Sequence, residues 1–322
     1  MSAPAVVVTR RLPQAVEREL ATRFGARLNA TDEPLGRDGL VRALREADAV
    51  VCTVTDRLSA DVLGAGGLRA KALVNVGVGF NHIDLAAARA AGLVVTNTPD
   101  VLTDATADCA MTLMLAVMRR AGEGERELRA GRWTGWRPTH LMGAQVTGKT
   151  VGIVGFGRIG RAMAERCHGG FRMPVLWFDP AIPAGAEPAG PWTRVGTLDE
   201  LLARADVVSL HCPATPETRH LINAERLRQM KRSAFLVNTA RGDVVDEAAL
   251  VAALEAGVIA GAGLDVYEHE PRVHAGLLAL ERVVLLPHLG SATVETRVAM
   301  GMRALENLEA VLAGVPPRDR VA

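Results

Sequence analysis

A series of short runs rich in valine, isoleucine, leucine and alanine constrains the fold of this chain most strongly. The first part of the chain contains such runs at residues 5–9, 47–53, 72–77 and 93–97. Helical patterns separate them, for example at residues 13–24 and 83–91. A second series occupies residues 150–157, 175–179, 205–211, 234–239, 259–266 and 283–288. Apolar runs of this length, alternating with helical segments, predict the buried strands of parallel sheets and therefore an α/β fold.

The length of the chain and an internal echo indicate two domains. The chain has 322 residues, of which 49% are hydrophobic, which is more than one ordinary core requires. Residues 72–95 and 235–259 both read as a strand, a glycine-bearing turn, a helix and a second strand. This echo predicts two related doubly wound units, although the general similarity of α/β sequences is an alternative explanation.

Two long helical patterns stand outside the regular alternation. One runs from Thr103 to Arg129 and predicts a single helix, which at 1.5 Å per residue would span ~38 Å. Such a helix is typical of a connector or a subunit contact, and a core helix with a frayed polar end is the alternative. The other pattern, residues 293–314, predicts one amphipathic helix closed by Gly314 and Pro316.

Charge and cysteine usage exclude several functional classes. Lysine plus arginine number 37 and aspartate plus glutamate 36, so a net charge of +1 predicts binding neither to nucleic acid nor to an anionic membrane. No run approaches ~20 apolar residues, and the N-terminal sequence does not resemble a signal peptide. The cysteines are widely spaced, which predicts no metal site and favours reduced thiols in the cytoplasm; they are Cys52, Cys109, Cys167 and Cys212.

The segment Gly155-Phe156-Gly157-Arg158-Ile159-Gly160 is the strongest local motif. It follows an apolar run and precedes an alanine-rich helical segment, the context in which glycines at this spacing bind a dinucleotide. Gly155 would form the tight turn, Gly157 would let a pyrophosphate approach the backbone, and Gly160 would let the helix pack on the strand. A glycine-rich turn without a nucleotide is the alternative.

Asp179 ends the next apolar run and bears on the choice of nucleotide. A carboxylate there accepts hydrogen bonds from the ribose hydroxyls of NAD and repels the 2′-phosphate of NADP. No lysine or arginine lies between Pro174 and Glu187 to bind such a phosphate. The sequence therefore predicts NAD as the cofactor, with NADP as the second choice.

Four side chains suited to chemistry follow the later apolar runs, namely Arg241, Asp265, Glu270 and His288. Ligands of open parallel sheets bind beyond the carboxyl ends of the strands. An arginine can bind a carboxylate through two parallel hydrogen bonds, and a histidine beside an acid is a usable proton donor because the acid stabilises the imidazolium. Taken singly, each residue is more typical of a structural role, but together at one sheet edge they predict a site.

Several blocks of the sequence resemble the D-isomer-specific 2-hydroxyacid dehydrogenases. These are VGVGFNHIDLAAARAAGLVVTNTPDVLTDATAD, KTVGIVGFGRIG, HCPATPETRHLIN, LVNTARGDVVDEAALVAAL, GAGLDVYEHEP and LLPHLGSAT. The resemblance runs from about Ala47 to the last helix, and NTPDVLTDATAD with RWTGWRP is similar to the glyoxylate/hydroxypyruvate reductase branch.

The resemblance implies two Rossmann-like, doubly wound parallel-sheet domains. Residues 1–98 plus 289–322 would form a discontinuous, flavodoxin-like substrate domain, and residues 99–288 an NAD-binding Rossmann domain. The active site would lie between the domains. The resemblance also implies a homodimer formed largely through the region of residues 103–129.

Catalytic roles follow from matching positions in the family. The resemblance implies that His288 is the general acid in reduction and the general base in oxidation, while Glu270 holds its imidazole and favours the protonated form. Arg241 would bind the carboxylate and the 2-oxo oxygen of the substrate. The N–H groups of Val76 and Gly77 would assist it.

The remaining implied contacts surround the substrate and the cofactor. Ser291 would complete the substrate site, and Trp136 would reach it from a partner subunit. Asp265 would lie near the nicotinamide amide. The implied cofactor-binding residues, beyond Gly155 to Gly160 and Asp179, are Thr106, Cys212, Pro213, Thr218, Thr239, Ala240, Arg241, Asp265, His288 and Gly290.

The sequence thus predicts an enzyme that reduces a small 2-oxo acid, such as glyoxylate or hydroxypyruvate, to the D-2-hydroxy acid. One alternative is a D-2-hydroxyacid dehydrogenase for bulkier acids. Formate dehydrogenase fits less well, because the resemblance would require glutamine where Glu270 stands. An NAD(H)-sensing protein similar to the C-terminal-binding co-repressors is the alternative from a different functional class.

Overall fold

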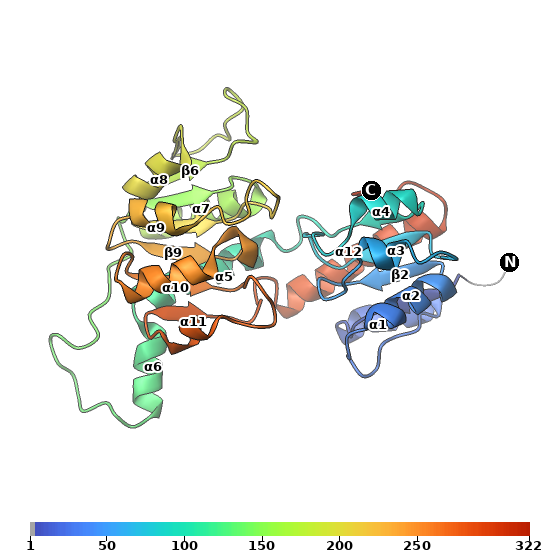
Figure 1. The fold of residues 1–322 in the computed structure, drawn as a ribbon, viewed down its shortest axis with the longest axis horizontal. Helices are drawn as coiled ribbons and strands as arrows, with labels where there is room; N and C mark the ends of the chain where they lie inside the picture. The colour runs from blue at the N-terminus through green and yellow to red at the C-terminus, as the bar shows by residue number, and fades with distance from the viewer. Residues whose placement is uncertain (1–3) are drawn as a thin grey trace. The chain divides into compact units, whose positions relative to one another are not determined.

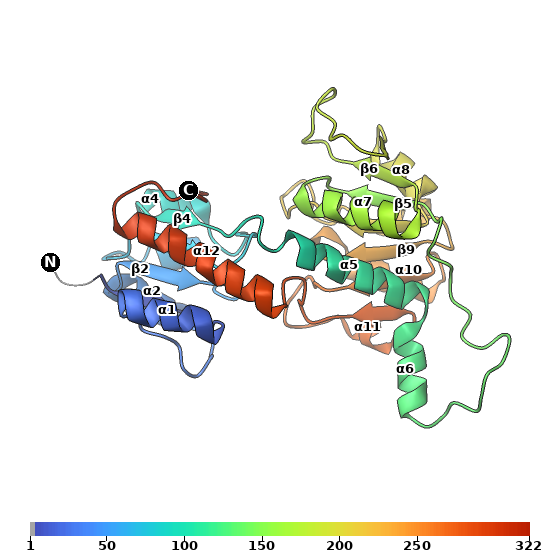
Figure 2. The ribbon, with the colours of Figure 1, turned by 180° about the vertical axis from the view of Figure 1, so that it is seen from behind.

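The computed structural model describes residues 4–322, which divide into two units. Unit 1 comprises the residues up to Leu102 together with Ala292–Ala322, and unit 2 comprises Thr103–Ser291. Each unit is built on a parallel sheet with helices on both faces (Figures 1 and 2). The expectation of two parallel-sheet α/β domains is confirmed.

The sheet of unit 1 has strands in sequence order. It contains β1 (Val6–Val8), β2 (Ala49–Cys52), β3 (Ala72–Asn75) and β4 (Val94–Thr96), all parallel. A parallel bridge between Val7 and Arg27 places a further short segment on the other side of β1. If this segment is counted as the second strand along the chain, the strands lie side by side in the order 2-1-3-4-5, which is the order of flavodoxin-like folds. Almost every strand residue is buried, which explains why the runs are continuously apolar.

Helices cover both faces of this sheet. Figure 2 shows α1 (Gln14–Phe24) and α12 (Val294–Leu312) on one face, and Figure 1 shows α2 (Arg37–Glu46), α3 (Ala60–Leu63) and α4 (Leu85–Ala90) on the other. The predicted final helix is one continuous helix, whose first turn is capped by the Thr293 side chain accepting from the Thr296 N–H. Gly301 lets it approach α1, because a Cβ there would lie 2.4 Å from Val16 Cγ2.

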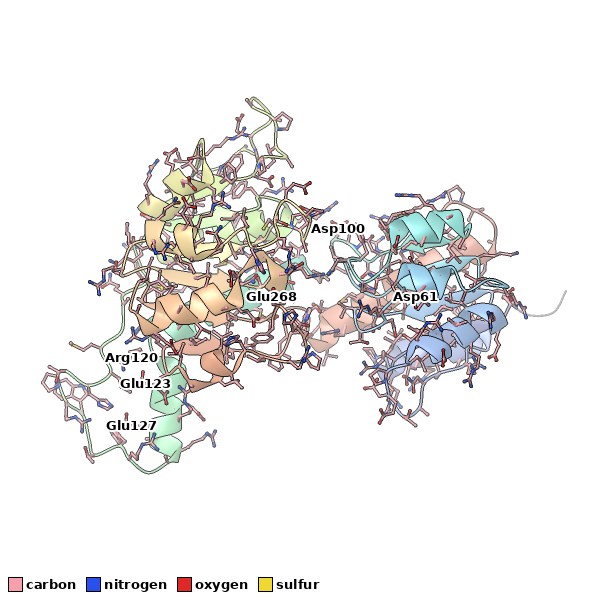
Figure 3. The ribbon with its side chains drawn as sticks, in the orientation of Figure 1. Asp61, Asp100, Arg120, Glu123, Glu127 and Glu268 are labelled. Atoms are coloured by element: carbon pink, nitrogen blue, oxygen red, sulfur yellow. The ribbon has the colours of Figure 1, made fainter. Side chains whose placement is uncertain are left out.

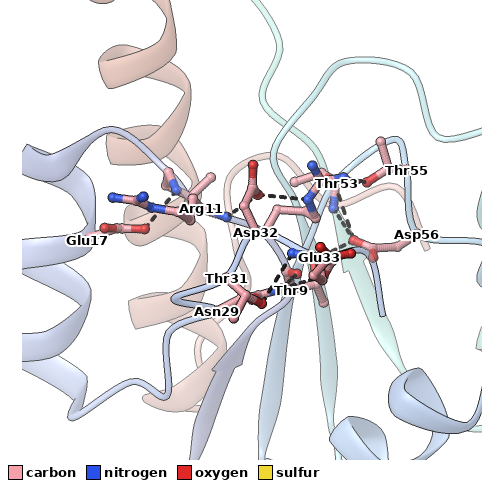
Figure 4. A network of polar contacts seen from close by, with 12 residues as sticks. Thr9, Arg11, Glu17, Asn29, Thr31, Asp32, Glu33, Thr53, Thr55 and Asp56 are labelled. Carbon is pink, nitrogen blue, oxygen red and sulfur yellow. Dashed lines mark hydrogen bonds and ion pairs between the residues drawn. The ribbon is translucent and has the colours of Figure 1, made fainter. Parts of the chain in front are cut away.

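A buried acid fixes the loop that follows β2. Asp56 is fully buried and accepts hydrogen bonds from the Thr9 hydroxyl and, at 2.7 Å, from the Thr53 N–H (Figure 4). Burial raises the pKa of Asp56 despite these donors. The network joins the carboxyl ends of β1 and β2, so it gives that edge of the unit 1 sheet a defined loop conformation.

The sheet of unit 2 has the Rossmann strand order. Its strands run β11-β10-β9-β8-β5-β6-β7, and all pairs are parallel. Read from β7, this is the order 3-2-1-4-5-6 with one more strand added, so the switch point lies between β5 and β8, where dinucleotides bind. The bounds are β5 Val151–Val154, β6 Val175–Phe178, β7 Trp192–Arg194, β8 Val207–Leu210, β9 Phe235–Asn238, β10 Gly261–Leu264 and β11 Val283–Leu285.

The sequence did not predict β7. None of its three residues is buried, so it lacks the apolar pattern that marks the other strands. It adds to the edge of the sheet beside β6, and Trp192 packs there edge-to-face against Phe156. Its position is therefore a result of tertiary packing rather than of a local pattern.

Helices cover both faces of the unit 2 sheet, with an apolar layer beneath each. Figure 2 shows α5 and α7 on one face, and Figure 1 shows α8, α9, α10 and α11 on the other. A short 3-10 turn, η1, precedes α10. The bounds are α5 Thr103–Met118, α7 Arg158–Phe171, α8 Leu198–Arg204, α9 Ala224–Gln229, η1 Gly242–Val244, α10 Glu247–Glu255 and α11 Ala275–Ala279.

The prediction of one long helix over residues 103–129 is wrong. The structure has two helices, α5 and α6 (Ala121–Arg129), because Arg120 adopts a left-handed conformation with φ 52°. The bend is held by the Arg120 guanidinium, which donates to both carboxylate oxygens of Glu123 at 2.8 and 2.7 Å (Figure 3). Gly122 and Gly124 lower the helix propensity of this stretch, so the chain turns there at little cost.

The internal echo between the two units is confirmed in three dimensions. The segments β3–α4–β4 and β9–α10–β10 share their order and also their polar details. Asn75 and Asn238 end the first strand of each segment, and each donates to carbonyls of the loop that follows. Asp84 and Asp246 each cap the helix by accepting a backbone N–H three residues on.

Candidate active site

The carboxyl ends of β9, β10 and β11 bring together three of the predicted catalytic side chains. Arg241 follows β9, Glu270 follows β10 and His288 follows β11. These strands are neighbours in the sheet. The sequence-based expectation that these residues share one sheet edge therefore agrees with the observed strand order.

His288 and Glu270 form a hydrogen-bonded pair. Nδ1 of His288 lies 2.8 Å from Oε2 of Glu270, and the two side chains are 32% and 35% exposed, so a ligand can reach them. With Nδ1–H donated to the carboxylate, Nε2 is the nitrogen left for a substrate. Burial acts to raise the pKa of Glu270, but the hydrogen bond and charge of His288, with help from the Tyr267 N–H and Arg241, hold that pKa below its ordinary value.

Asp265 builds the turn that carries His288. Its carbonyl accepts the His288 N–H at 2.9 Å, and its carboxylate oxygens accept the N–H groups of Leu289 at 2.6 Å and Gly290 at 2.7 Å. His288 has φ 56°, a left-handed conformation that non-glycine residues rarely adopt and that is enriched at functional sites. Burial raises the pKa of Asp265 in spite of the two donated hydrogen bonds. The structure thus gives Asp265 a positioning role.

Arg241 belongs to a loop that packs backbone to backbone on the Glu270 loop. A Cβ at Gly242 would lie 1.9 Å from the carbonyl carbon of Tyr267 and 2.3 Å from the Glu268 nitrogen, so only glycine fits there. Nη1 of Arg241 donates to the Ala240 carbonyl at 2.6 Å. Burial lowers the pKa of Arg241, while the charges of Glu270 and Asp243 oppose that shift. The guanidinium keeps its charge at neutral pH and can bind an anion.

The glycine turn after β5 has the features that a dinucleotide requires. Gly155 has φ 87°, and a Cβ there would lie 2.5 Å from the Cys212 nitrogen on the loop after β8. A Cβ at Gly160 would lie 2.2 Å from the Gly155 carbonyl oxygen, so α7 packs directly on the turn. Gly157 faces open space and caps α7 without a side-chain hydrogen bond. The N-terminus of this 14-residue helix is therefore open to a pyrophosphate, which its first turn and its dipole can bind.

Asp179 lies at this turn, as the spacing predicted. Its Oδ2 accepts the Phe156 N–H at 2.8 Å and its Oδ1 accepts the Ala181 N–H at 2.9 Å. The Phe156 side chain points the other way, fully buried and stacked on Trp177 with ring centroids 4.5 Å apart. Phe156 thus contributes its backbone to the turn and its ring to the core.

The other expected cofactor residues differ in what they offer a ligand. The Thr239 hydroxyl is buried and has no hydrogen-bond partner within residues 4–322, so it can serve a bound group. The Thr218 hydroxyl is occupied within its own turn, because it donates to the Pro213 carbonyl at 2.7 Å and accepts the Thr215 N–H at 2.8 Å. Burial raises the pKa of the Cys212 thiol to about 11, so it stays neutral.

The backbone N–H groups of the loop after β3 in unit 1 differ in their partners. The Val76 N–H donates to the Cys52 carbonyl at 2.8 Å, and the Gly77 N–H donates to the Asn75 carbonyl at 3.1 Å. The next two N–H groups, of Val78 and Gly79, donate to no acceptor among the described residues. The carbonyls of Gly77 and Gly79 are held by the buried Asn75 amide at 3.1 and 3.0 Å.

The two remaining predicted substrate contacts, Ser291 and Trp136, lie in loops of unit 2. Ser291 is half-buried and follows Gly290 in the turn after His288, and Trp136 is 82% exposed in the loop after α6. The four cysteines are free thiols. Within residues 4–322 no group of three or more His, Cys, Asp or Glu side chains could hold a metal ion, and no helix is long and apolar enough to cross a membrane.

Comparison with known proteins decides the family. Residues 111–290 match the model of the D-isomer specific 2-hydroxyacid dehydrogenase, NAD binding domain. A glyoxylate reductase of Thermofilum pendens is 44% identical over 98% of this chain and 94% of its own length. The chain belongs to the D-isomer specific 2-hydroxyacid dehydrogenases. The family resemblance of the sequence is confirmed, and the chain is an NAD(P)-dependent oxidoreductase.

Solved structures of other dehydrogenases agree over the whole chain. A glyoxylate reductase from Paecilomyes thermophila has a TM-score of 0.87 and 33% identity, covering 100% of this chain and 99% of that one. An NADPH-dependent glyoxylate/hydroxypyruvate reductase from Sinorhizobium meliloti, in complex with NADP and malonate, has a TM-score of 0.88 and 35% identity, covering 100% and 97%. The fold described above is thus shared with these two reductases over nearly their full length.

Proposed function

We propose that this dehydrogenase reduces a small 2-oxo acid, glyoxylate or hydroxypyruvate, to the D-2-hydroxy acid, with NADH as the preferred reductant and NADPH as the second. The observation that carries the proposal is the His288–Glu270 hydrogen bond on the sheet edge that also bears Arg241. A proton donor and a carboxylate-binding cation are the two groups that reduction of a 2-oxo acid requires. The names of the related reductases support the same substrate class.

In this mechanism, the chain binds and polarises the substrate and supplies the proton. A nicotinamide cofactor held by the glycine turn and Asp179 would supply the hydride that C2 of the substrate accepts. Arg241 holds the substrate carboxylate and stabilises negative charge on the 2-oxo oxygen, and His288 donates its Nε2 proton to that oxygen. Glu270 stabilises the imidazolium before transfer and fixes the ring by accepting from Nδ1. In the oxidation direction, Nε2 of His288 accepts the proton of the substrate 2-hydroxyl group.

We also propose that the Val78 and Gly79 N–H groups, rather than those of Val76 and Gly77, bind the substrate carboxylate. The Val76 and Gly77 donors are occupied by backbone carbonyls, whereas the next two are not. Ser291 stays a proposed substrate contact. Around the cofactor, we propose the glycine turn for the pyrophosphate, Asp179 for the ribose and Thr239 for the nicotinamide end.

The preference for NADH is tested by replacing Asp179 with asparagine. Asparagine keeps an acceptor for the Phe156 N–H but removes the charge that repels a 2′-phosphate. We expect the ratio of kcat/KM with NADH to kcat/KM with NADPH to fall about tenfold or more, since ~1.4 kcal/mol of discrimination corresponds to one decade. A wild-type enzyme that already prefers NADPH would show that the role proposed for Asp179 is wrong.

We propose a homodimer formed through the segment of α6 and the loop that follows it, residues 121–148. This segment extends from the body of unit 2 (Figure 1), and α6 has no buried residue. It carries several exposed large apolar side chains, of which Leu128 is 61%, Trp133 51%, Trp136 82% and Met142 66% exposed. At its base lies a hollow of about 560 Å³ lined by Met118, Arg120, Met142 and Phe235 among others. Apolar exposure of this kind is typical of an interface between subunits.

Sedimentation velocity of a Trp133→Ala, Trp136→Ala double variant tests the dimer. We expect wild type to sediment as a dimer at micromolar concentration and the variant to dissociate, because aromatic anchors dominate interface energetics. Val315→Ser is the matched control, since Val315 is 52% exposed outside this segment. If Trp136 also reaches the partner's substrate, a Trp136→Ala variant that remains dimeric has a raised KM for the 2-oxo acid. A monomeric wild type would contradict the proposal.

We place the enzyme in the cytoplasm. The four free thiols support this placement, and burial raises the pKa of Cys167 to about 12, which keeps it unreactive. Reduced cysteines are typical of proteins in a reducing compartment.

Initial rates with a panel of 2-oxo acids test the proposed function. We expect kcat/KM to be highest for glyoxylate or hydroxypyruvate and to fall with larger side chains, and we expect D-glycerate from hydroxypyruvate. If kcat/KM is highest for a bulky 2-oxo acid, the proposed small substrate is wrong and the enzyme acts on a larger one. Binding of NADH without turnover of any acid would instead favour a nucleotide-sensing protein.

A further inference from the structure

A second histidine–carboxylate pair lies at the same sheet edge as the proposed catalytic pair. Nε2 of His220 is 2.7 Å from Oε1 of Glu268, and the Glu268 side chain is only 13% exposed. Arg219 approaches the same oxygen at 3.5 Å from a more exposed position. Glu268 stands two residues before Glu270, yet none of the roles proposed above uses it.

Glu268 is anchored from three directions. Its N–H donates to Oε1 of Glu247, a buried residue in the first turn of α10, at 2.7 Å. Its nitrogen lies against Gly242, where a Cβ would come within 2.3 Å. Its carboxylate meets His220, whose own N–H donates to the Asp243 carbonyl at 2.8 Å. The loops after β8, β9 and β10 therefore meet at this one residue.

The loop that carries Glu268 also makes a hydrogen bond to the carboxylate of Glu270, the acidic residue paired with His288. Oε1 of Glu270 accepts the Tyr267 N–H at 3.1 Å, while Oε2 binds His288. A shift of the backbone at Tyr267 and Glu268 would therefore move the carboxylate that holds the imidazole. Because Gly242 packs on that same backbone, the shift would also move the loop that bears Arg241.

Two acidic and two basic residues lie near Glu268. Glu247 accepts the Glu268 N–H from α10, and Glu270 stands two residues further along the same loop. His220 and Arg219, both from the loop after β8, are the basic groups that face Glu268. His220 is the closer and less exposed of the two, so its hydrogen bond contributes more than the exposed Arg219 pair.

We propose that Glu268 and His220 are positioning residues that fix the loops bearing Glu270 and Arg241. They thereby keep the Glu270–His288 pair and the Arg241 guanidinium correctly placed for the substrate. The inference rests on the proposed function of His288, Glu270 and Arg241. The pair does not touch the substrate. It acts through the backbone of Tyr267 and Glu268.

A pair of His220 variants tests this inference. His220→Ala removes the hydrogen bond to Glu268, whereas His220→Gln keeps an N–H donor near the position of Nε2. Glu217→Gln is the control, since it removes an exposed carboxylate from the same loop, one that makes no contact with Glu268. For each variant, amide hydrogen exchange of residues 265–272 and the KM values for the 2-oxo acid and for NADH are measured.

We expect His220→Ala to speed exchange of the Tyr267 and Glu268 amides and raise KM for the 2-oxo acid about tenfold, the scale of one lost charge-assisted hydrogen bond. KM for NADH should stay within about twofold, and His220→Gln and Glu217→Gln should resemble wild type. Unchanged exchange in His220→Ala would overturn the inference, as would a failure of His220→Gln to restore it or an equal rise in both KM values. A wild type that reduces no 2-oxo acid would refute the proposed function, while the exchange comparison would still decide whether the pair fixes the loop.

Discussion

Replacing His288 with asparagine is expected to lower kcat for reduction by about 10²-fold or more, the usual scale for loss of a general acid. Asparagine suits this position because it tolerates the left-handed φ of 56°, so the turn held by Asp265 should persist. NADH affinity, measured by fluorescence titration, should remain near that of wild type. A lower kcat with unchanged NADH affinity would show that the substitution slows the chemical step.

Two comparisons sharpen the His288 result. His168→Asn is the control, because His168 is exposed in the last turn of α7 and lies outside the proposed site. Glu270→Gln should give a smaller loss than His288→Asn, since glutamine can still accept from Nδ1 but cannot stabilise the imidazolium. Near-normal turnover of a folded His288→Asn protein would remove His288 from the mechanism.

Replacing Arg241 with alanine should mainly weaken binding of the 2-oxo acid. The substrate carboxylate would lose its charged partner, and we expect KM to rise about 30-fold or more, which corresponds to ~2 kcal/mol. Arg241→Lys should recover only part of the loss, because an ammonium cannot donate two parallel hydrogen bonds. KM for NADH should stay near the wild-type value in both variants.

The control for Arg241 is Arg228→Ala, which removes an exposed arginine from α9. Thermal unfolding of each variant, followed by circular dichroism, separates loss of binding from loss of fold, since Arg241 lies in a tightly packed loop. If KM and kcat of a folded Arg241→Ala enzyme equal those of wild type, the proposed substrate contact does not exist.

The fold was largely predictable because its strands are buried on both faces. Continuous apolar runs mark the strands of both sheets except β7, whose residues are not buried and therefore carry no such pattern. The break between α5 and α6 was missed for a different reason. It depends on a left-handed Arg120 held by Glu123, a local arrangement that helical periodicity does not record.

The candidate site was predictable in its residue types and in the His288–Glu270 pair, but not in its other hydrogen bonds. The positions of Arg241, Glu270 and His288 after neighbouring strands follow from the sequence pattern. The sequence pattern does not show which N–H groups of the β3 loop lack an acceptor. The Val76 N–H, for example, donates to the Cys52 carbonyl at the end of β2. The His220–Glu268 pair was also missed, since its members lie 48 residues apart in the sequence and tertiary packing brings their loops together.

Transfer of deuterium from NADH that carries deuterium at both positions of nicotinamide C4 tests the central claim most directly. The labelled cofactor is incubated with hydroxypyruvate and the enzyme, and the product is examined by mass spectrometry and chiral chromatography. We expect glycerate of the D configuration with deuterium at C2, and we expect the parallel reaction with the His288→Asn enzyme to be slower by about 10²-fold. Unlabelled product, the L enantiomer, or no product from wild type would contradict it.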